Sequence, residues 1–560
     1  MPKEFRKFGP PGTGKTSSLA TRDIPQAVAA YGSEKIIVAS YTKAAAVEIA
    51  NKRSRDTGER IHVNPDNVGT LHALCFRALG RPEIAEAHKK EWNDIYGNMY
   101  PITGSLKGAM DEGGVNNQSS AQGDEMLSGL NILRARMKPR IRTSTKDFEK
   151  KWTEFKNDNG YMDFTDLIEV ALDKTIYAPG QPKVMFVDEA QDFTPLQLKL
   201  VRSWSQHMEW LVLLGDDDQT IFSFTGSSPD AFLNPPIDAK FKTVLSQSYR
   251  VPQVILERSQ KLIKKVMVRE PKIYKPRMDQ TTGLPAVGKI RNHYENFKNF
   301  QRIIDEIKDY VANEKTVMLL ASCSYMLDRL KNELKINGIP FHNPYRKTRS
   351  DWNPLVRSSQ KTMPVDTLLA FLSDNKQSDK SWTVRQFVNW AKELKVGENG
   401  LVKKVGKNGI KFLKQAIEDD EEGLDSVKDA IGDMLTPNAL KHAMDRNIPW
   451  LMENINVKKA EKLEYPLKVY KKFGESALKK QPLVTIGTIH SVKGGESQIV
   501  YLFPDISYQA AQEIHGSNSI QATDAACRLF YVGMTRASEE LVIMDPIRTK
   551  SSRGALYVEI

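Results

Sequence analysis

The stretch KFGPPGTGKTSS, residues 7–18, decides the fold of this chain. It contains the complete pattern G-x-x-x-x-G-K-[ST], from Gly9 to Thr16, and it follows a short strand candidate, EFRKF (residues 4–8). Glycine adopts backbone angles that other residues avoid, so successive N–H groups of such a loop can wrap phosphate oxygens. A strand before the loop and a helix after it favour a phosphate-binding loop over an ordinary turn.

The side chains of this loop complete a nucleotide site. Lys15 supplies a point charge for the β- and γ-phosphates, and the Thr16 hydroxyl supplies a ligand for Mg²⁺. The helix expected from about residue 15 to residue 30 turns its positive N-terminus toward the same anion. The predicted nucleotide-binding residues of the loop are Gly9, Pro10, Pro11, Gly12, Thr13, Gly14, Lys15, Thr16 and Ser17.

Strand and helix candidates alternate on both sides of a polar, mostly helical stretch. Apolar strands are predicted at residues 4–8, 35–41, 182–192, 210–219 and 242–250, with a strand and turn at 68–74 and a helix at 43–53. A second such series has strands at 289–294, 316–323, 483–490, 498–504 and 540–546, and helices near 297–312 and 325–337. This rhythm predicts parallel sheets with helices on both faces.

The expected fold class is α/β, with two RecA-like parallel-sheet domains in tandem, each interrupted by a mostly helical insertion. The expected boundaries are residues 1–75 and 160–245 for the first core, 76–159 for its insertion, 246–344 and 481–560 for the second core, and 345–480 for its insertion. The role of the second insertion stays open.

Composition narrows the class of protein. The 560 residues carry 81 Lys and Arg against 69 Asp and Glu, a net charge of +12 that suits a polyanion partner. The three cysteines have no C-x-x-C spacing, which disfavours a zinc ribbon or a disulfide framework. The first residues lack an apolar segment, and no apolar run approaches the roughly 18 residues of a membrane span, so we expect a soluble intracellular protein.

Acidic residues follow two of the predicted strands. In MFVDEAQD (residues 185–192), Asp188 suits Mg²⁺ coordination and Glu189 can orient or deprotonate water. Gln191 and Gln219, the latter in GDDDQT, are candidate sensors of the γ-phosphate. The carboxyl ends of parallel strands are where α/β proteins bind ligands. An acidic loop after a core strand is the alternative interpretation.

Together these stretches resemble the UvrD/Rep/PcrA-like helicases of superfamily 1A, because eight motifs occur in family order. They are GPPGTGKT (9–16), SYTKAAAVEIA (40–50), GTLHAL (69–74), DEAQD (188–192), GDDDQTIFSFTG (215–226), LSQSYR (245–250), TIHSVKGGE (488–496) and YVGMTRA (531–537). The resemblance covers both predicted cores and does not extend into residues 100–145 or 345–480.

The resemblance implies that ATP is hydrolysed with Mg²⁺ between the two cores. The implied catalytic residues are Lys15, Glu189, Gln219, Arg250 and Arg536, and the implied metal ligands are Thr16 and Asp188. Tyr249 occupies the position whose ring stacks on adenine, and Glu496 the position that contacts the ribose. Arginines that reach the γ-phosphate from the second core would couple hydrolysis to movement of the cores.

The resemblance also implies a track for single-stranded DNA, with 3′→5′ polarity. The residues at motif positions that touch the strand are Tyr41, Thr42, His72, Phe224, Thr488 and His490. Aromatic side chains suit this role because base stacking tolerates any sequence. Ordinary packing or surface positions are the alternative for the two histidines.

Three departures from the family pattern bear on this expectation. Phe224 and Thr225 stand where relatives carry Trp and Arg, which reduces the stacking surface and removes a cation. Gly495 stands where an apolar residue is usual. The phosphate loop begins at the ninth residue of the sequence, so no residues form the adenine-reading Q motif, and we expect base selectivity to depend mainly on Tyr249.

Three hypotheses follow. The first is an ATP-dependent 3′→5′ DNA helicase that translocates on single strands and meets single-strand/duplex junctions, as a monomer or weak dimer, with a possible protein activator, in the cytoplasm at the nucleoid. The second is a translocase that strips proteins from single strands without efficient unwinding. The third is a nucleotide-gated nucleic-acid-binding module, which the intact Lys15, Glu189, Gln219, Arg250 and Arg536 disfavour.

Overall fold

A computed structural model gives the fold over most of the chain. It describes residues 3–41, 49, 63–104, 121–138, 145–346, 351–357, 363–373, 382–403, 405–418, 433–516, 519–547 and 556–560. The chain divides into two compact units. The first unit comprises Met1–Asn299, Leu320–Met326 and Thr488–Ile560, and the second comprises Phe300–Leu319 and Leu327–Gly487. Every predicted site residue that the structure describes belongs to the first unit, whereas the four-part division into cores and insertions stays a prediction.

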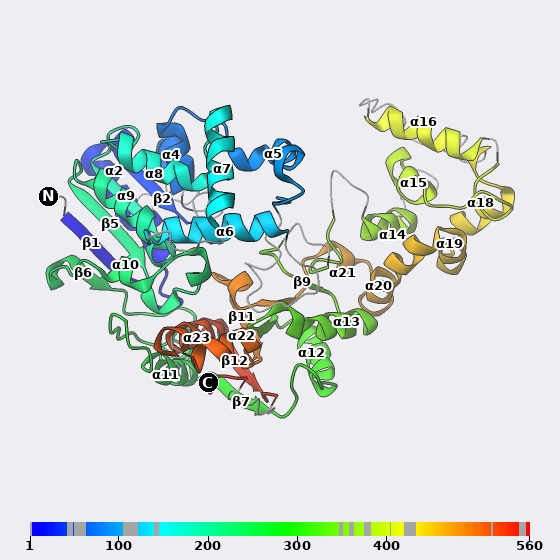
Figure 1. Cartoon of the computed structure of the whole chain (residues 1–560). Coiled ribbons are helices and arrows are strands. Elements are labelled where there is room, and N and C mark those ends of the chain that lie inside the picture. The colour runs from blue at the N-terminus through cyan, green and yellow to red at the C-terminus, as the bar shows by residue number, and fades with distance from the viewer. Residues whose placement is uncertain are drawn as a thin grey trace. The chain divides into compact units, whose positions relative to one another are not determined.

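The N-terminal sheet carries the phosphate loop. Its strands lie in the order β3 (Val68–Thr70), β2 (Ile36–Ser40), β4 (Val184–Asp188), β5 (Trp210–Gly215), β1 (Lys3–Phe8) and β6 (Lys242–Val244), with parallel pairings (Figure 1). Its helices are α1 (Lys15–Ser18), α2 (Ile24–Tyr31), α4 (Leu71–Ala78), α8 (Phe164–Lys174), α9 (Pro195–Ser205) and α10 (Pro229–Leu233). Ser40 pairs with Asp188 and Phe8 with Gly215, so β1, β2, β4 and β5 reach the same carboxyl edge.

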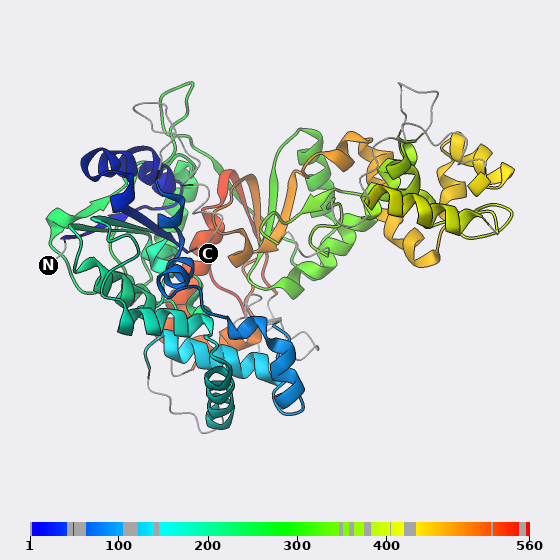
Figure 2. The same ribbon diagram turned by 90° about the horizontal axis from the view of Figure 1, so that it is seen from above.

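Three helices interrupt this part of the chain. They are α5 (Lys89–Tyr96), α6 (Gln122–Ala135) and α7 (Lys146–Asn159), which lie together in Figures 1 and 2. Their inward faces supply an apolar cluster around Trp92, Phe148 and Trp152, each essentially inaccessible to solvent. This cluster gives the interruption a hydrophobic core of its own.

The second sheet is also parallel in the pairings that the structure describes. Its order is β7 (Lys289–His293), β12 (Ala537–Met544), β11 (Ser497–Leu502), β8 (Val317–Ala321), β10 (Val484–Thr488) and β9 (Phe341–His342). The helices of this part are α11 (Gln253–Ile263), α12 (Arg302–Ala312), α13 (Asp328–Ile336), α22 (Tyr508–Ile514) and α23 (Ser519–Met534).

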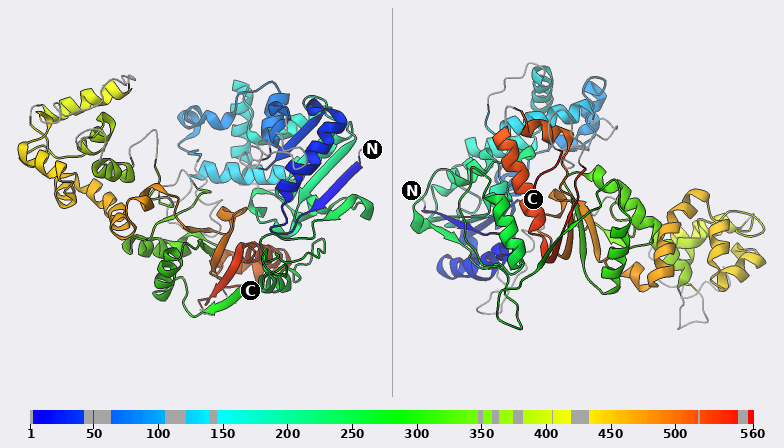
Figure 3. Two further views of the ribbon diagram at one scale, coloured as in Figure 1. Left: turned by 180° about the vertical axis from the view of Figure 1, so that it is seen from behind. Right: turned by 90° about the horizontal axis from the view of Figure 1, so that it is seen from below.

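A helical group separates β9 from β10 in the sequence. It contains α14 (Pro364–Leu372), α15 (Val384–Ala391), α16 (Gly406–Glu418), α18 (Pro437–Met444), α19 (Ile448–Asn454), α20 (Val457–Phe473) and α21 (Ser476–Lys479), shown in yellow-green to orange in Figure 3. The expected fold class, two parallel-sheet α/β domains with helical interruptions, is therefore confirmed. Among the described residues, no helix is long and apolar enough to cross a membrane.

Several element boundaries differ from the sequence expectations. The expected turn after β3 is wrong, because Thr70 caps a helix instead: its Oγ1 accepts a hydrogen bond from the Ala73 N–H at 3.2 Å, and α4 follows. The strand expected at 242–250 is ordered as β6 for only three residues, and the helix expected from 297 begins at Arg302. The helix expected at 43–53 lies almost entirely outside the described residues.

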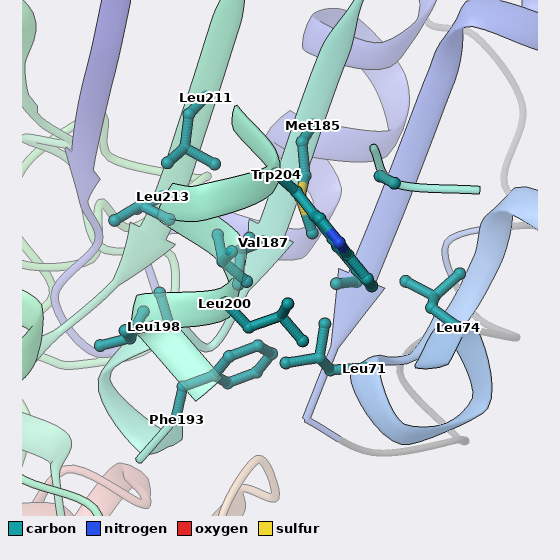
Figure 4. Packing of buried hydrophobic residues seen from close by; sticks show 14 of the residues in the cluster. Leu71, Leu74, Met185, Val187, Phe193, Leu198, Leu200, Trp204, Leu211 and Leu213 are labelled. Carbon is teal, nitrogen blue, oxygen red and sulfur yellow. The ribbon is translucent and has the colours of Figure 1, made fainter. Parts of the chain in front are cut away.

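The apolar core beneath the carboxyl edge holds the site residues in place. Met185 and Val187 of β4, Leu211 and Leu213 of β5, and Trp204 of α9 pack together (Figure 4). All five side chains are fully buried. Burying an apolar side chain of this size contributes roughly 1.5–3 kcal/mol, so the strands that present Asp188 and Gly215 are firmly anchored.

Candidate nucleotide and nucleic-acid site

The phosphate loop leaves β1 and turns directly into α1. Gly12 and Gly14 have φ angles of 73° and 72°, a left-handed conformation that glycine adopts without strain. The Gly9 N–H donates to the Gly215 carbonyl oxygen at 2.9 Å, and Lys15 Nζ donates to the Gly9 carbonyl oxygen at 2.8 Å. A Cβ on Gly9 would lie 1.9 Å from Lys15 Cγ, so Gly9 is required for close approach rather than for a positive φ.

Two carboxylates at the end of β4 face the loop. Asp188 Oδ2 accepts a hydrogen bond from Thr16 Oγ1 at 3.0 Å, and Asp188 is completely buried. Its other oxygen, Oδ1, has no hydrogen-bond partner within the part of the chain that the structure describes. Burial and the adjacent Glu189 charge raise the pKa of Asp188 to about 7. The Lys15 charge and the Thr16 hydrogen bond act in the opposite direction but do not offset burial, so this carboxylate would gain from a bound cation.

Glu189 lies in the left-handed conformation, with φ 53° and ψ 41°. Burial opposes its ionised form, but the charges of Lys15 and Lys493 outweigh burial and lower the pKa of Glu189 to about 2. Gln191 Nε2 donates to Glu189 Oε2 at 2.5 Å, and Gln191 Oε1 accepts from the Asp216 N–H at 3.0 Å. Gln191 therefore connects the ends of β4 and β5 and fixes the Glu189 side chain.

Residues from the C-terminal motifs meet this edge. Arg536 is 1% exposed, and its Nη2 donates to Gln219 Oε1 at 3.3 Å while its Nη1 donates to the Gly495 carbonyl oxygen at 3.1 Å. Lys493 Nζ contacts Asp192 Oδ2 and donates to the Gln219 carbonyl oxygen at 2.9 Å. Gln219 is thus held between two cations.

The segment at 248–250 packs against the phosphate loop. Ser248 Oγ donates to the Pro11 carbonyl oxygen at 2.9 Å, and the Tyr249 N–H donates to the Gly12 carbonyl oxygen at 2.8 Å. The Tyr249 side chain is 68% exposed, so its ring is free to stack. Arg250 Nε donates to Glu496 Oε2 at 2.5 Å, which brings together the predicted arginine finger and the predicted ribose ligand.

An aromatic cluster lies beside these residues. The Tyr41 ring stacks on Phe222 with centroids 5.7 Å apart, and Phe224 contacts both Phe222, at 5.9 Å, and His490, at 5.5 Å. Lys493 Nζ lies 5.0 Å from the Phe222 ring centroid. The structure thus brings Tyr41, Phe224 and His490 together.

The remaining predicted strand-binding residues are not in this cluster. His72 packs edge-on against Phe164 at 6.0 Å. Thr488 is fully buried. Thr42 lies outside the described residues.

Sequence reasoning missed three contributors: Lys493, Asp192 and Phe222. All three lie inside motifs quoted for other residues, TIHSVKGGE, DEAQD and GDDDQTIFSFTG. The signal was therefore present, but a motif does not show which of its side chains turn inward. The Lys493–Asp192 pair is nearly buried, and burial raises the pKa of Asp192 to about 6 despite the lysine.

The residues present fit a magnesium–nucleotide complex better than a metal bound by protein alone. Among the described residues, no three His, Cys, Asp or Glu side chains gather as a metal cage. Mg²⁺ is usually held by one or two protein ligands together with substrate phosphates and water. Thr16 Oγ1, Asp188 and its unpartnered Oδ1 match that pattern.

These features define a P-loop NTPase with two parallel-sheet domains. Comparison with known families specifies it further: residues 8–240 match the UvrD/REP helicase N-terminal domain, and residues 341–545 match the UvrD-like helicase C-terminal domain. The chain belongs to the UvrD-like family of superfamily 1A, whose members are ATP-dependent DNA helicases.

Individual relatives are distant. The chain is 24% identical over 327 residues to the putative ATP-dependent DNA helicase YjcD of Bacillus subtilis, covering 54% of this chain and 41% of that protein. It is 22% identical over 617 residues to the ATP-dependent DNA helicase PcrA of Staphylococcus aureus, covering 95% and 80%. It is 23% identical to the ATP-dependent DNA helicase Rep of Buchnera aphidicola, covering 70% and 67%.

Proposed function

We propose that this chain is a 3′→5′ DNA helicase that translocates on single-stranded DNA and hydrolyses ATP with Mg²⁺. One observation carries the proposal: the phosphate loop, Asp188, Glu189 and Gln219 follow strands that end at one sheet edge, and Arg536 and Lys493 contact Gln219 there. The relatives named as DNA helicases and the net charge of +12 support the same function.

The cations of the site have separate tasks in this proposal. Lys15 binds the β- and γ-phosphates, while Arg250 and Arg536 stabilise charge on the transferred phosphoryl group. An arginine in this role contributes about 10³–10⁵ in rate. Gln219 accepts a hydrogen bond from Arg536. Loss of the γ-phosphate would therefore change the contacts of both side chains at the same time. Tyr249 would stack on the base and Glu496 would contact the ribose.

Thr16 and Asp188 would hold Mg²⁺, which supplies positive charge that bridges the phosphate oxygens. Glu189 would position the attacking water. With Lys15 and Lys493 facing it, Glu189 is a weak base. When the phosphates of ATP pair with Lys15, they would reduce the effect of its charge on Glu189. Binding of ATP would therefore raise the pKa of Glu189 and make it a stronger base.

The strand-binding residues are proposed from the aromatic cluster of Tyr41, Phe222, Phe224 and His490. Tyr41, Phe222 and Phe224 are partly exposed, and each base stacked on such a ring would be worth about 1–3 kcal/mol. Lys493 contacts both Phe222 of this cluster and the carbonyl oxygen of Gln219. A strand bound to these rings would therefore be coupled to the nucleotide site through the Lys493 side chain. Thr42 and His72 would extend the track, and Thr488 would support His490 from a buried position.

A second function rests on the turn at Phe224 and Thr225. Thr225 Oγ1 donates to the Phe222 carbonyl oxygen at 2.7 Å, so this side chain serves the turn and offers no cation to a strand. A weaker grip favours a translocase that displaces bound proteins without efficient unwinding. Both functions place the enzyme on intracellular DNA, as a monomer or weak dimer.

The deciding experiment measures ATP hydrolysis with and without a single-stranded oligonucleotide, and unwinding of duplexes with a 3′ or a 5′ tail. The helicase proposal expects stimulated hydrolysis and opening of the 3′-tailed duplex alone. Stimulated hydrolysis with neither duplex opened, but with displacement of a protein from a coated strand, would favour the translocase.

Replacement of Glu189 tests the catalytic assignment. Glu189→Gln should bind ATP as the parent does and hydrolyse it at least about 10²-fold more slowly. Equal turnover would contradict the role of Glu189. A panel of NTPs in the same assay would test whether Tyr249 selects the base.

A further inference from the structure

Three consecutive acidic residues are buried behind the candidate sensor Gln219. Asp216, Asp217 and Asp218 follow β5, and none of them has any solvent exposure. Three adjacent carboxylates removed from water repel one another and lose their hydration, so they require compensating cations. The proposed ATP hydrolysis assigns them no direct role.

Lys272 contacts all three carboxylates. Its Nζ lies 3.1 Å from Asp216 Oδ1, 2.5 Å from Asp217 Oδ1 and 3.0 Å from Asp218 Oδ2, and the residue is 4% exposed. Arg269 pairs only with Asp218, through two hydrogen bonds of 2.8 and 2.6 Å. Lys272 is therefore the cation that faces Asp216 among the described residues.

Asp216 in turn fixes the orientation of the sensor. Gln219 Nε2 donates to Asp216 Oδ2 at 2.7 Å, and Gln219 Oε1 accepts from Arg536 Nη2 at 3.3 Å. A carboxylate only accepts hydrogen bonds and a guanidinium only donates them, so the amide fits in one orientation. If Asp216 became a donor, it would compete with Arg536 for Gln219 Oε1, and the amide would no longer have a single favoured orientation.

We propose that Lys272 is a positioning residue for Gln219: it holds Asp216 as a hydrogen-bond acceptor and thereby fixes which end of the Gln219 amide faces Arg536. This inference rests on the proposed function, in which Gln219 senses the γ-phosphate. Without Lys272, Arg269 is the one cation among the described residues that pairs with the three carboxylates, and it pairs with Asp218 alone. The cluster then takes up a proton or rearranges, and the amide loses its fixed orientation.

The test compares Lys272→Met with Arg269→Met, which removes the same charge from the same cluster without touching Asp216. With the full chain and a saturating oligonucleotide, Lys272→Met should lower kcat by about 10- to 100-fold and change KM for ATP by less than about threefold. Arg269→Met should keep kcat within about threefold of the parent. Combined with Gln219→Ala, Lys272→Met should lower kcat no further, because both changes remove the same interaction.

If Lys272→Met does not fold, the charge-balanced variant Asp216→Asn/Lys272→Met replaces it. The Asn oxygen still accepts from Gln219 and needs no cation, so this variant should match Asp216→Asn alone in kcat. Equal losses for Lys272→Met and Arg269→Met, an additive loss with Gln219→Ala, or a double variant much slower than Asp216→Asn would overturn the inference. A parent chain without ATP turnover would instead overturn the proposed function, and the inference with it.

Discussion

Replacing Gly12 with alanine tests whether the 248–250 segment depends on its contact with the phosphate loop. Gly12 has a φ of 73°, and a Cβ built on it would lie 2.5 Å from Arg250 Cβ and 2.8 Å from Ser248 Oγ. The Arg250 contact is about 0.9 Å shorter than the 3.4 Å at which ordinary contact begins. The alanine methyl group therefore displaces the segment that carries Tyr249 and Arg250.

The expected loss has two parts. The left-handed conformation costs an L-residue roughly 1–2 kcal/mol, which appears as lower stability. Displacement of Arg250 by about 1 Å costs about 10²-fold in rate, because catalytic groups lose their alignment over such distances. Two powers of ten correspond to about 3 kcal/mol in the activation free energy. We expect kcat/KM for ATP to fall by about 10²-fold.

A matched control separates strain from displacement. Gly160 ends α7 with a φ of 69°, and a Cβ there would meet no atom within 4 Å. Gly160→Ala should therefore destabilise the protein to a similar extent, measured by urea unfolding, and leave kcat/KM unchanged. The reasoning fails if Gly12→Ala retains the parent kcat/KM, or if Gly160→Ala loses as much activity as Gly12→Ala.

Three further predictions concern other parts of the first unit. Phe222→Leu removes one ring of the proposed strand-binding cluster, which contacts Tyr41. Loss of about 1 kcal/mol of base stacking should raise the oligonucleotide concentration for half-maximal ATPase about fivefold while the rate without DNA stays constant. The Asp163 carboxylate is buried against two cations that lower its pKa to about 2, overcoming the effect of burial. Its stabilisation, roughly 2 kcal/mol, is complete above pH 4 and lost as the pH falls toward 2, so the urea midpoints of the parent and Asp163→Asn should converge over that interval. Burial raises the pKa of the Cys75 thiol to about 12, so a disulfide reagent should label the native protein slowly and the urea-unfolded protein at three sites, which are Cys75, Cys323 and Cys527.

The strands were predictable because their signal is local. Apolar runs such as those of β2, β4 and β8 are buried on both faces of a parallel sheet and form continuous hydrophobic segments in the sequence. The phosphate loop was equally visible, since its glycines and Lys15 act within one turn. The helix α4 was mistaken for a turn because its start depends on a single hydrogen bond from Ala73 to Thr70.

The site was predictable only as a set of positions. Motif order supplied Asp188, Gln219 and Arg536, but their contacts depend on segments more than 300 residues apart in the chain, which no local pattern encodes. The same limit explains why sequence alone does not single out Phe222 and Lys493, although both lie inside family motifs. A motif indicates that a stretch is functional, whereas tertiary packing determines which of its side chains face the site.

The buried acidic residues after β5 show this limit most clearly. A run of three aspartates in a sequence indicates an exposed loop, because ionised carboxylates are rarely buried without partners. Here the partner is Lys272, some 54 residues later in REPKIYK, a stretch with no recognisable pattern. Further contacts hold the stretch that carries Lys272 against the acidic cluster: Arg269 pairs with Asp218, and the Glu270 N–H donates to Asp217 Oδ2 at 2.9 Å. Arg528 Nε also donates to the Asp217 carbonyl oxygen, at 3.0 Å. Arg528 belongs to α23, the helix that ends just before Arg536. The helix that precedes the predicted arginine finger Arg536 thus also contacts the acidic cluster behind Gln219. A displacement of α23 would therefore move both Arg536 and the residues that orient Gln219.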